Sequence, residues 1–141
     1  MIYKAVKYIL VNDSDFATAM GTDDDGDVKI YPIHPRKEVS LPFGTFNITD
    51  DQGNATKDNP TISGMDNQRV RIIVYGTNLD TLVDIAEKAR IAMDNEKEGG
   101  TYNTVVVESI DFERITDDYD QSTGEKGAYV LNLDFEIWSI P

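Results

Sequence analysis

Strict alternation of apolar and polar side chains near the end of the chain limits its fold more than any other pattern in the sequence. Within residues 127–138, every second position carries an apolar or aromatic side chain: Tyr129, Leu131, Leu133, Phe135 and Ile137. The positions between the last four carry Asn132, Asp134 and Glu136. A period of two residues is typical of a β-strand with one buried and one solvated face. The pattern therefore predicts an antiparallel strand that covers a core on one side and meets water on the other.

A second strand and a long helix are predicted in the middle of the chain. Residues 68–76 alternate again, with Val70, Ile72 and Val74 on one face and Arg69, Arg71, Ile73 and Tyr75 on the other. Residues 79–93 carry apolar side chains at helical spacing. Thr77 and Asp80 approximate a capping box at the start of this helix, and Gly99-Gly100 is predicted to end it.

The first part of the chain predicts two helical segments and two strands. Residues 2–11 have helical spacing, and a short helical turn follows with Ser14 or Asp15 as its predicted N-cap. Strands are predicted at 28–33 and 41–48. Pro32 and Pro35 are predicted to end the first of these strands, because proline has no N–H to donate to a neighbouring strand.

A fourth strand is predicted at residues 104–115, and its alternation changes phase. The apolar positions are odd up to Val107 and even from Ile110. A β-bulge near Glu108 and Ser109 accounts for this change. An acidic turn is then predicted at 117–126, before the closing strand.

Residues 49–67 separate the two halves of the pattern. They are rich in Asp, Asn and Gly and are longer than most connections in a compact domain, so we expect a protruding loop or hairpin arm. With no repeat and no linker, residues 1–141 are predicted to form a single domain. The expected fold class is α+β, a mainly antiparallel sheet of about five strands packed by two helices, in the order αββ, long arm, βαββ.

Composition narrows the class of protein further. Apolar residues make up 40% of the chain, which is enough for a core, and there is no cysteine for disulfides or thiolate metal sites. The first residues lack the long apolar run of a signal peptide or a membrane span. We therefore expect a soluble protein made in a cytoplasm.

The formal net charge is −13, from 26 acidic and 13 basic residues. This balance argues against a general nucleic-acid binder, because neutralising phosphates requires clustered Lys and Arg. Such a charge either keeps the protein soluble or forms a surface that lies near DNA without binding it. The charge alone does not choose between these interpretations.

No catalytic arrangement is visible in the sequence. His34 is the only histidine, and no nucleophile-elbow pattern accompanies it. The glycines do not have a phosphate-binding spacing. Paired carboxylates such as Asp117 and Asp118 are unavoidable among 26 acidic residues and do not indicate glycosidase chemistry. We predict a protein that is not an enzyme and has no cofactor.

The acidic loops do not match a calcium-binding motif. An EF-hand loop carries acids at positions one, three and five, glycine at six and glutamate at twelve. Placing Gly26 at position six makes Gly21 the first and Pro32 the twelfth residue, and placing Gly124 there makes Tyr119 the first. We predict solvated acidic loops and no metal site.

Arg69 and Arg71 are conspicuous because basic residues are scarce. On a strand they share one face, with Tyr75 further along it. One interpretation is an exposed sheet face on which they pair with neighbouring acids. The other is a contact with an acidic surface of another copy, since Arg and Tyr are enriched at interfaces.

The order of these elements resembles the tail-terminator, or tail-completion, proteins of long-tailed bacteriophages. Such proteins begin with a short helix and a strand, followed by a proline-containing segment like Tyr31-Pro32-Ile33-His34-Pro35. Leu41-Pro42-Phe43-Gly44-Thr45-Phe46 looks like their second strand, and residues 68–75 leading into 79–93 look like their central strand and long helix. The paired strands after Gly99-Gly100 also match. The resemblance covers nearly the whole chain but rests on layout.

The resemblance implies a structural virion protein of a phage or prophage neck, made in the host bacterial cytoplasm. Copies would form a ring, expected to be a hexamer, that ends tail-tube polymerisation and joins tail to head. Its partners would be other copies, the tail-tube protein and the head connector, with DNA passing through the channel without specific binding and no membrane involved. The residues expected to make contacts are Arg69, Arg71, Tyr75, Asp50, Asp51, Ile62, Met65, Asp117, Asp118, Tyr119 and Asp120.

A different function remains open from the sequence. The chain could be a non-enzymatic acidic binding module that pairs with a basic protein. Self-assembly distinguishes the two functions, because a stable monomer that binds a basic protein fits only the binding module.

Overall fold

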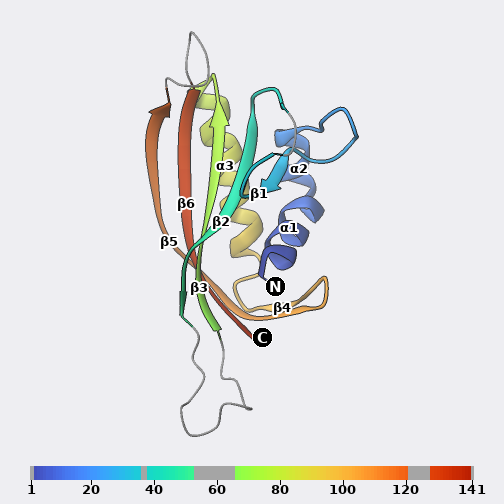
Figure 1. The fold of residues 1–141 in the computed structure, drawn as a ribbon, viewed down its shortest axis with the longest axis vertical. Helices are drawn as coiled ribbons and strands as arrows, with labels where there is room; N and C mark the ends of the chain where they lie inside the picture. Colours follow the sequence, from blue (N-terminus) through green and yellow to red (C-terminus); the bar gives the residue numbers. More distant parts are fainter. Residues whose placement is uncertain (1, 36–37, 53–65, 121–127, 141) are drawn as a thin grey trace, which may run out of the picture.

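The computed structural model describes residues 2–35, 38–52, 66–120 and 128–140 (Figure 1). These residues form three helices and one six-stranded sheet. The helices are α1 (Ile2–Asn12), α2 (Ser14–Met20) and α3 (Leu79–Asp94). The strands are β1 (Ile30–Pro32), β2 (Phe43–Gln52), β3 (Asp66–Gly76), β4 (Gly100–Tyr102), β5 (Val105–Asp120) and β6 (Ala128–Ile140). The predicted α+β class is confirmed, with an additional strand and with a full helix in place of the short helical turn.

The strands lie side by side in the order β1-β2-β3-β6-β5-β4. Only β1 runs parallel to its neighbour, and every other adjacent pair is antiparallel. The two shortest strands, β1 and β4, lie at the two edges of the sheet. β4 pairs with β5 only from Val105 to Val107, so within the described chain no strand lies beside the outer edge of β5 from Ser109 onward.

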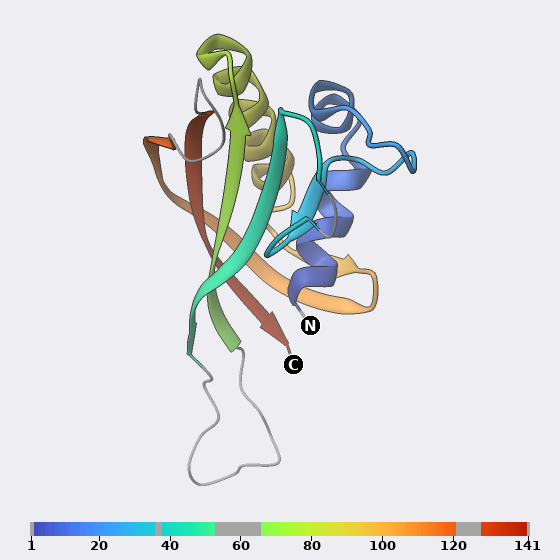
Figure 2. The same cartoon turned by 45° about the horizontal axis from the view of Figure 1, so that its top comes forward.

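All three helices lie on the same face of the sheet (Figures 1 and 2). Adjacent side chains from β3 and β6 point toward them, with Val70 beside Phe135 and Ile72 beside Leu133, all four buried. The largest fully buried side chains come from both layers: Phe16, Phe46, Phe135, Leu10, Met20, Ile30, Ile72, Leu82, Ile85, Met93, Ile110 and Leu133. No helix in the described ranges has the length and apolar character needed to cross a membrane.

The alternation in β3 is confirmed, and the alternation in β6 is confirmed from Leu131 to Ile137 except at Asp134. At the start of β6 the pattern reverses, because Tyr129 is exposed while Ala128 and Val130 on the opposite face are buried. Asp134 is buried although it lies on the face predicted to meet water. Its neighbours on that face, described below, account for its burial.

The predicted N-cap residues of α2 and α3 were wrong by one or two positions, although α3 begins at Leu79 as predicted. Asp13 caps α2, accepting a hydrogen bond at Oδ1 from the N–H of Phe16 at 2.9 Å. Asn78 caps α3 and accepts one from the N–H of Thr81 at 3.2 Å. In each case the cap is the last residue with an extended backbone, and Asp and Asn are as effective there as Ser or Thr.

The connection after α3 is longer than predicted and contains a missed strand. The helix ends at Asp94, before Gly99-Gly100, and β4 begins at Gly100. Gly99 has a φ of 88°, and a Cβ there would collide with the carbonyl oxygen of Val107. Asn103 and Thr104, both with positive φ, then turn the chain directly into β5. A two-residue turn of this kind usually carries glycine, which explains why the sequence did not reveal it.

β5 confirms one predicted irregularity and adds another. Its register with β6 shifts between Val107 and Ser109, where the bulge was expected, and again between Phe112 and Arg114. The predicted acidic turn was placed too early, because β5 continues to Asp120.

The predicted arm is partly strand. β2 continues to Gln52 and β3 begins at Asp66, and these ends pair, with Gln52 opposite Asn67. Residues 53–65, which carry the rest of the predicted arm, lie outside the described residues. The first strand is shorter than predicted, since β1 spans only Ile30–Pro32 and Val28 forms an isolated bridge with Thr22.

Candidate functional site

The face of the sheet turned away from the helices carries a network of charged side chains across four strands. Arg69 and Arg71 alternate with the buried Val70 and Ile72, so they project from this open face, as predicted. The register places Asp134 of β6 directly beside Arg71 and Glu136 beside Arg69. The open face is therefore the part of the described structure where predicted contact residues come together.

Asp134 is the centre of the network. Arg71 donates two hydrogen bonds to its carboxylate, from Nε to Oδ1 at 2.7 Å and from Nη2 to Oδ2 at 3.1 Å. Arg114 of β5 donates a third, from Nε to Oδ2 at 2.9 Å. The Asp134 side chain is only 5% exposed. The two hydrogen bonds from Arg71, and then the one from Arg114, lower the pKa of this carboxyl against the opposing effect of burial.

Arg69 makes a second, more exposed set of ion pairs. Its Nε lies 2.9 Å from Glu113 Oε1 on β5, and its Nη1 lies 3.4 Å from Asp50 Oδ2 on β2. Glu136 on β6 lies 4.0 Å away. Hydrogen bonding to Glu113 raises the pKa of this guanidinium. Together the two arginines cross-link β2, β3, β6 and β5, so the network braces the face that no helix covers.

The other predicted contact residues lie in three places. Tyr75 is on the open face near the end of β3, stacked on Phe43 with ring centroids 4.8 Å apart. Asp117, Asp118 and Tyr119 are exposed near the end of β5, where Tyr119 meets Tyr129 at 5.2 Å. The backbones of Asp51 and Asp120 lie in β2 and β5. Ile62 and Met65 lie outside the described residues.

Sequence reasoning missed Asp134 and Glu113 as partners of the two arginines, and Arg114 as a third arginine in the network. Asp134 and Glu136 were assigned to the correct face of their strand, but pairing two strands requires their register. Glu113 and Arg114 lie at the second bulge of β5, which shifts the register there. The alternation of apolar and polar residues in the sequence did not predict this second bulge.

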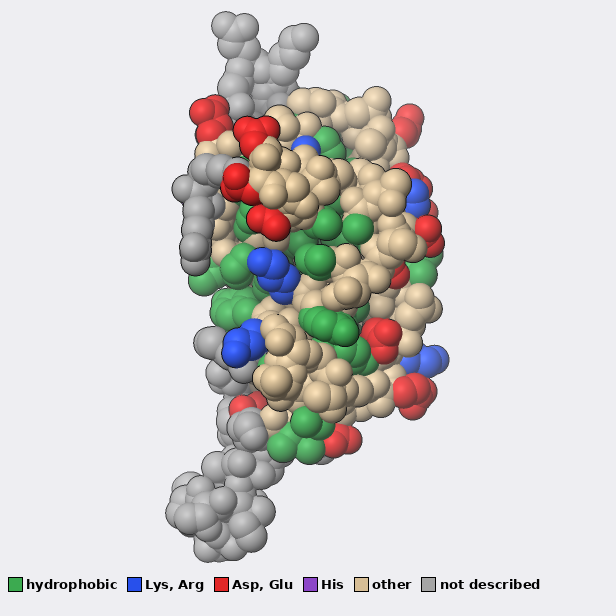
Figure 3. Space-filling model, turned by 90° about the vertical axis from the view of Figure 1, so that its right-hand side faces the viewer, with side chains coloured by type: hydrophobic (Ala, Val, Ile, Leu, Met, Phe, Trp, Pro, Cys, Tyr) green, Lys and Arg blue, Asp and Glu red, His purple; other side chains and the backbone are tan. Residues whose placement is uncertain are grey.

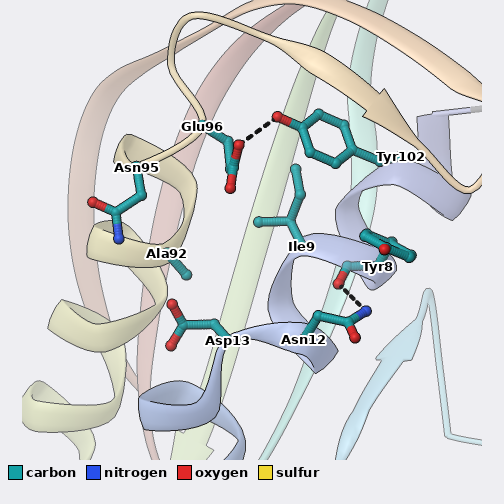
Figure 4. A pocket seen from close by; sticks show the side chains of 8 residues that line it. All are labelled: Tyr8, Ile9, Asn12, Asp13, Ala92, Asn95, Glu96 and Tyr102. Carbon is teal, nitrogen blue, oxygen red and sulfur yellow. Dashed lines mark hydrogen bonds between the residues drawn. The ribbon is translucent and has the colours of Figure 1, made fainter.

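A small hollow lies between α1, α3 and β4 (Figure 4). It has a volume of about 120 Å³ and is lined by residues that include Tyr8, Asn12, Asp13 and Tyr102. The hydroxyl of Tyr102 donates to Glu96 Oε2 at 2.6 Å, and burial together with this bond raises the pKa of Tyr102. Its lining residues include no nucleophile–base pair. Its contacts fasten β4 to the end of α3.

Three carboxylates approach one another in the loop after α2. Oxygens of Asp23, Asp25 and Asp27 lie within 4.8 Å of one another, an arrangement that the motif test on the sequence did not reveal. Asp23 Oδ1 accepts hydrogen bonds from the N–H groups of Asp25 and Asp27, and its Oδ2 accepts one from the Tyr31 hydroxyl at 2.8 Å. These bonds account for the loop's conformation.

His34, the only histidine of the sequence, is exposed just after β1.

No protein-family model matches the chain, and no curated protein matches its sequence. A solved structure does match: a chain from the virion of a native gene transfer agent particle superposes with a TM-score of 0.72. The match covers 96% of this chain and 91% of that chain, at 15% sequence identity. Over nearly its whole length, this chain therefore has the fold of a chain found in a gene transfer agent virion.

Proposed function

We propose that the chain is a structural protein of a phage-like virion, and that its copies form a ring in the neck that ends tail-tube polymerisation and joins tail to head. The observation that carries the proposal is the fold shared with the gene transfer agent virion chain, which spans both chains almost completely. The layout of helix, proline-containing segment, central strand and long helix adds the tail-terminator role. The braced open face fits a scaffold subunit, because the network holds four strands in one register.

The charge of the chain fits the passage of DNA through such a ring. Six copies, each of formal charge −13, would carry −78 in total. Acidic walls repel phosphates, so DNA slides past them without binding. Mixing the assembled protein with double-stranded DNA at low salt should give no shift in gel mobility. A stable complex would contradict this part of the proposal.

Electron microscopy of negatively stained protein tests the ring directly. The protein is imaged alone at high concentration and after mixing with the tail-tube protein of the same phage or prophage, with a tube protein from an unrelated phage as the control. Closed rings, or a cap at one end of shortened cognate tubes, are the expected result. A monomer that ignores the tube and binds a basic protein would overturn the proposal in favour of an acidic binding module.

A further inference from the structure

Exposed apolar side chains are concentrated where α3 and β5 lie next to each other. Arg90 of α3 lies over the ring of Phe112 of β5, 3.9 Å from its centroid, so this side of α3 faces β5. Leu79 and Val83 precede Arg90 by about three and about two helical turns, which places them on the same side. Both are exposed.

β5 adds two exposed apolar side chains to the same surface. In the register with β6, Ile115 is opposite Leu133 and Tyr119 is opposite Tyr129, so both project from the helix-covered face of the sheet. Ile115 is 50% exposed. α3 and β5 run in opposite directions, so Leu79 and Val83 lie toward the same end as Ile115 and Tyr119 (Figure 1). We call Leu79, Val83, Ile115 and Tyr119 the α3–β5 surface.

Acidic side chains accompany this surface. Asp117 lies between Ile115 and Tyr119 on the same face of β5 and is exposed. On α3, Asp80 and Glu87 are exposed as well. The α3–β5 surface is thus an apolar strip with acidic side chains along it, which suits an apolar partner with basic groups at matching positions.

One surface of the same chain has this complementary chemistry. α1 carries no acidic residue, and its exposed side includes Lys4, Lys7 and Tyr8. With Val11, Asn12 and Asn103 these residues line a groove of about 260 Å³. We call this groove the α1 surface. The methylene stems of the lysines and the ring of Tyr8 supply apolar area below positive charges.

The two surfaces lie on different sides of the molecule. In Figure 1, α1 is on the right and β5 is at the left edge. Figure 3 views the α1 side, where basic and hydrophobic side chains lie next to one another. Surfaces on different sides of one subunit cannot satisfy each other within that subunit, but they can link successive copies.

We propose that the α1 surface of one copy docks on the α3–β5 surface of the next, with Lys4 and Lys7 beside Asp80 and Asp117. This head-to-tail contact is heterologous and closes into a ring when the rotation per subunit allows. Pairing two α3–β5 surfaces would instead set acid against acid, which costs several kcal/mol in like-charge contacts. The inference rests on the proposed function, because it supplies the contact between ring subunits.

Reversal of charge tests this contact. One variant carries Lys4→Glu and Lys7→Glu, and the other carries Asp80→Lys and Asp117→Lys. All four positions are exposed, so circular dichroism should show the wild-type fold for both. Alone, each variant should associate about a hundredfold or more weakly than wild type, because like charges then meet across the contact. An equal mixture should assemble again, since each contact then pairs lysines with acids.

Sedimentation velocity and microscopy on the cognate tube measure assembly. The control for the acidic variant is Asp24→Lys with Glu38→Lys, which makes the same charge change at exposed positions elsewhere and should assemble like wild type. Lys97→Glu is the control for the basic variant. If wild type forms rings and either charge-reversed variant also forms normal rings alone, this contact is wrong. The contact is also wrong if wild type forms rings but the mixture does not recover assembly. In both cases the proposed ring itself would stand. Absence of wild-type rings both alone and on the tube would overturn the proposed function and this contact together.

Discussion

Arg71 and Arg114 approach the same carboxylate, that of Asp134, from the two strands that flank β6. They are not equivalent, because Arg71 makes two hydrogen bonds to it and Arg114 makes one. The Arg114 side chain is also 63% exposed, against 36% for Arg71. The carboxylate of Asp134 is buried and needs hydrogen bonds from the protein, and it receives more of them from Arg71 than from Arg114.

Arg71→Ala should therefore destabilise the protein more than Arg114→Ala. We expect Arg71→Ala to lower the free energy of unfolding by about 1–3 kcal/mol, since it leaves a buried carboxylate short of hydrogen bonds. Arg114→Ala should cost less. Urea denaturation followed by the fluorescence of Trp138, the only tryptophan, measures both. Lys88→Ala, which removes an exposed pair with Asp84, is the control and should change nothing measurable. Equal losses for the two arginine variants would contradict this ranking.

Acid should remove the contribution of Asp134 to stability. Its pKa is lowered in the folded protein, so the folded state favours the charged form more than the unfolded state does. That contribution is fully present above the ordinary carboxyl value of 3.8 and is lost as the pH falls through the lowered value. The stability difference between wild type and Asp134→Asn should therefore shrink as the pH falls from about 5 to about 2. Urea midpoints measured across this range test it, and a constant difference would show that the charge of Asp134 is not responsible.

Gly99→Ala should be far more damaging than Gly26→Ala. Both glycines have positive φ, 88° and 83°, so an alanine at either carries a conformational cost of about 1–2 kcal/mol. At Gly26 the new Cβ meets open space, whereas at Gly99 it collides with backbone atoms of Val107 and Glu108. Thermal unfolding compares the two, with Gly26→Ala as the matched control. Similar melting temperatures would mean that the connection after α3 can shift away from β5.

Tyr31 should ionise well above an ordinary tyrosine. Burial and the hydrogen bond to Asp23 raise its pKa to about 12. The protonated form is therefore favoured by folding, so this contribution is present below pH 10 and declines as the pH rises toward 12. Subtracting the phenolate absorbance of Tyr31→Phe from that of wild type isolates this titration. In Asp23→Asn, which removes the charge and one of the two accepting oxygens, the titration should move toward 10; no movement would rule out a role for the Asp23 carboxylate.

Much of the fold was predictable because a strand or helix with one buried face carries apolar residues at a regular period in the sequence. β3, β6 and α3 were each found from periodicity, and the first bulge of β5 from a change of phase. β4 escaped notice because its three residues are too few to show a period and its turn contains no glycine. The parallel pairing of β1 was equally invisible, since pairing direction depends on how the chain folds back.

The candidate site was predictable only in part, for a related reason. Alternation placed Arg69 and Arg71 on one face and Asp134 and Glu136 on the solvated side of another strand. It could not say which strands are neighbours, and so could not pair Arg71 with Asp134. The burial of Asp134 follows from that pairing, because a carboxylate held by two guanidiniums tolerates removal from water.

Among the described residues, the outer edge of β5 has no neighbouring strand from Ser109 onward, so at high protein concentration it can meet the same edge of another copy. A bare strand edge is a template onto which other strands can stack, and such stacking leads to fibrils. Along this stretch Asp111, Asp117 and Asp118 are exposed. Charged side chains on an edge strand oppose such stacking, so these acids disfavour pairing between the β5 edges of two copies.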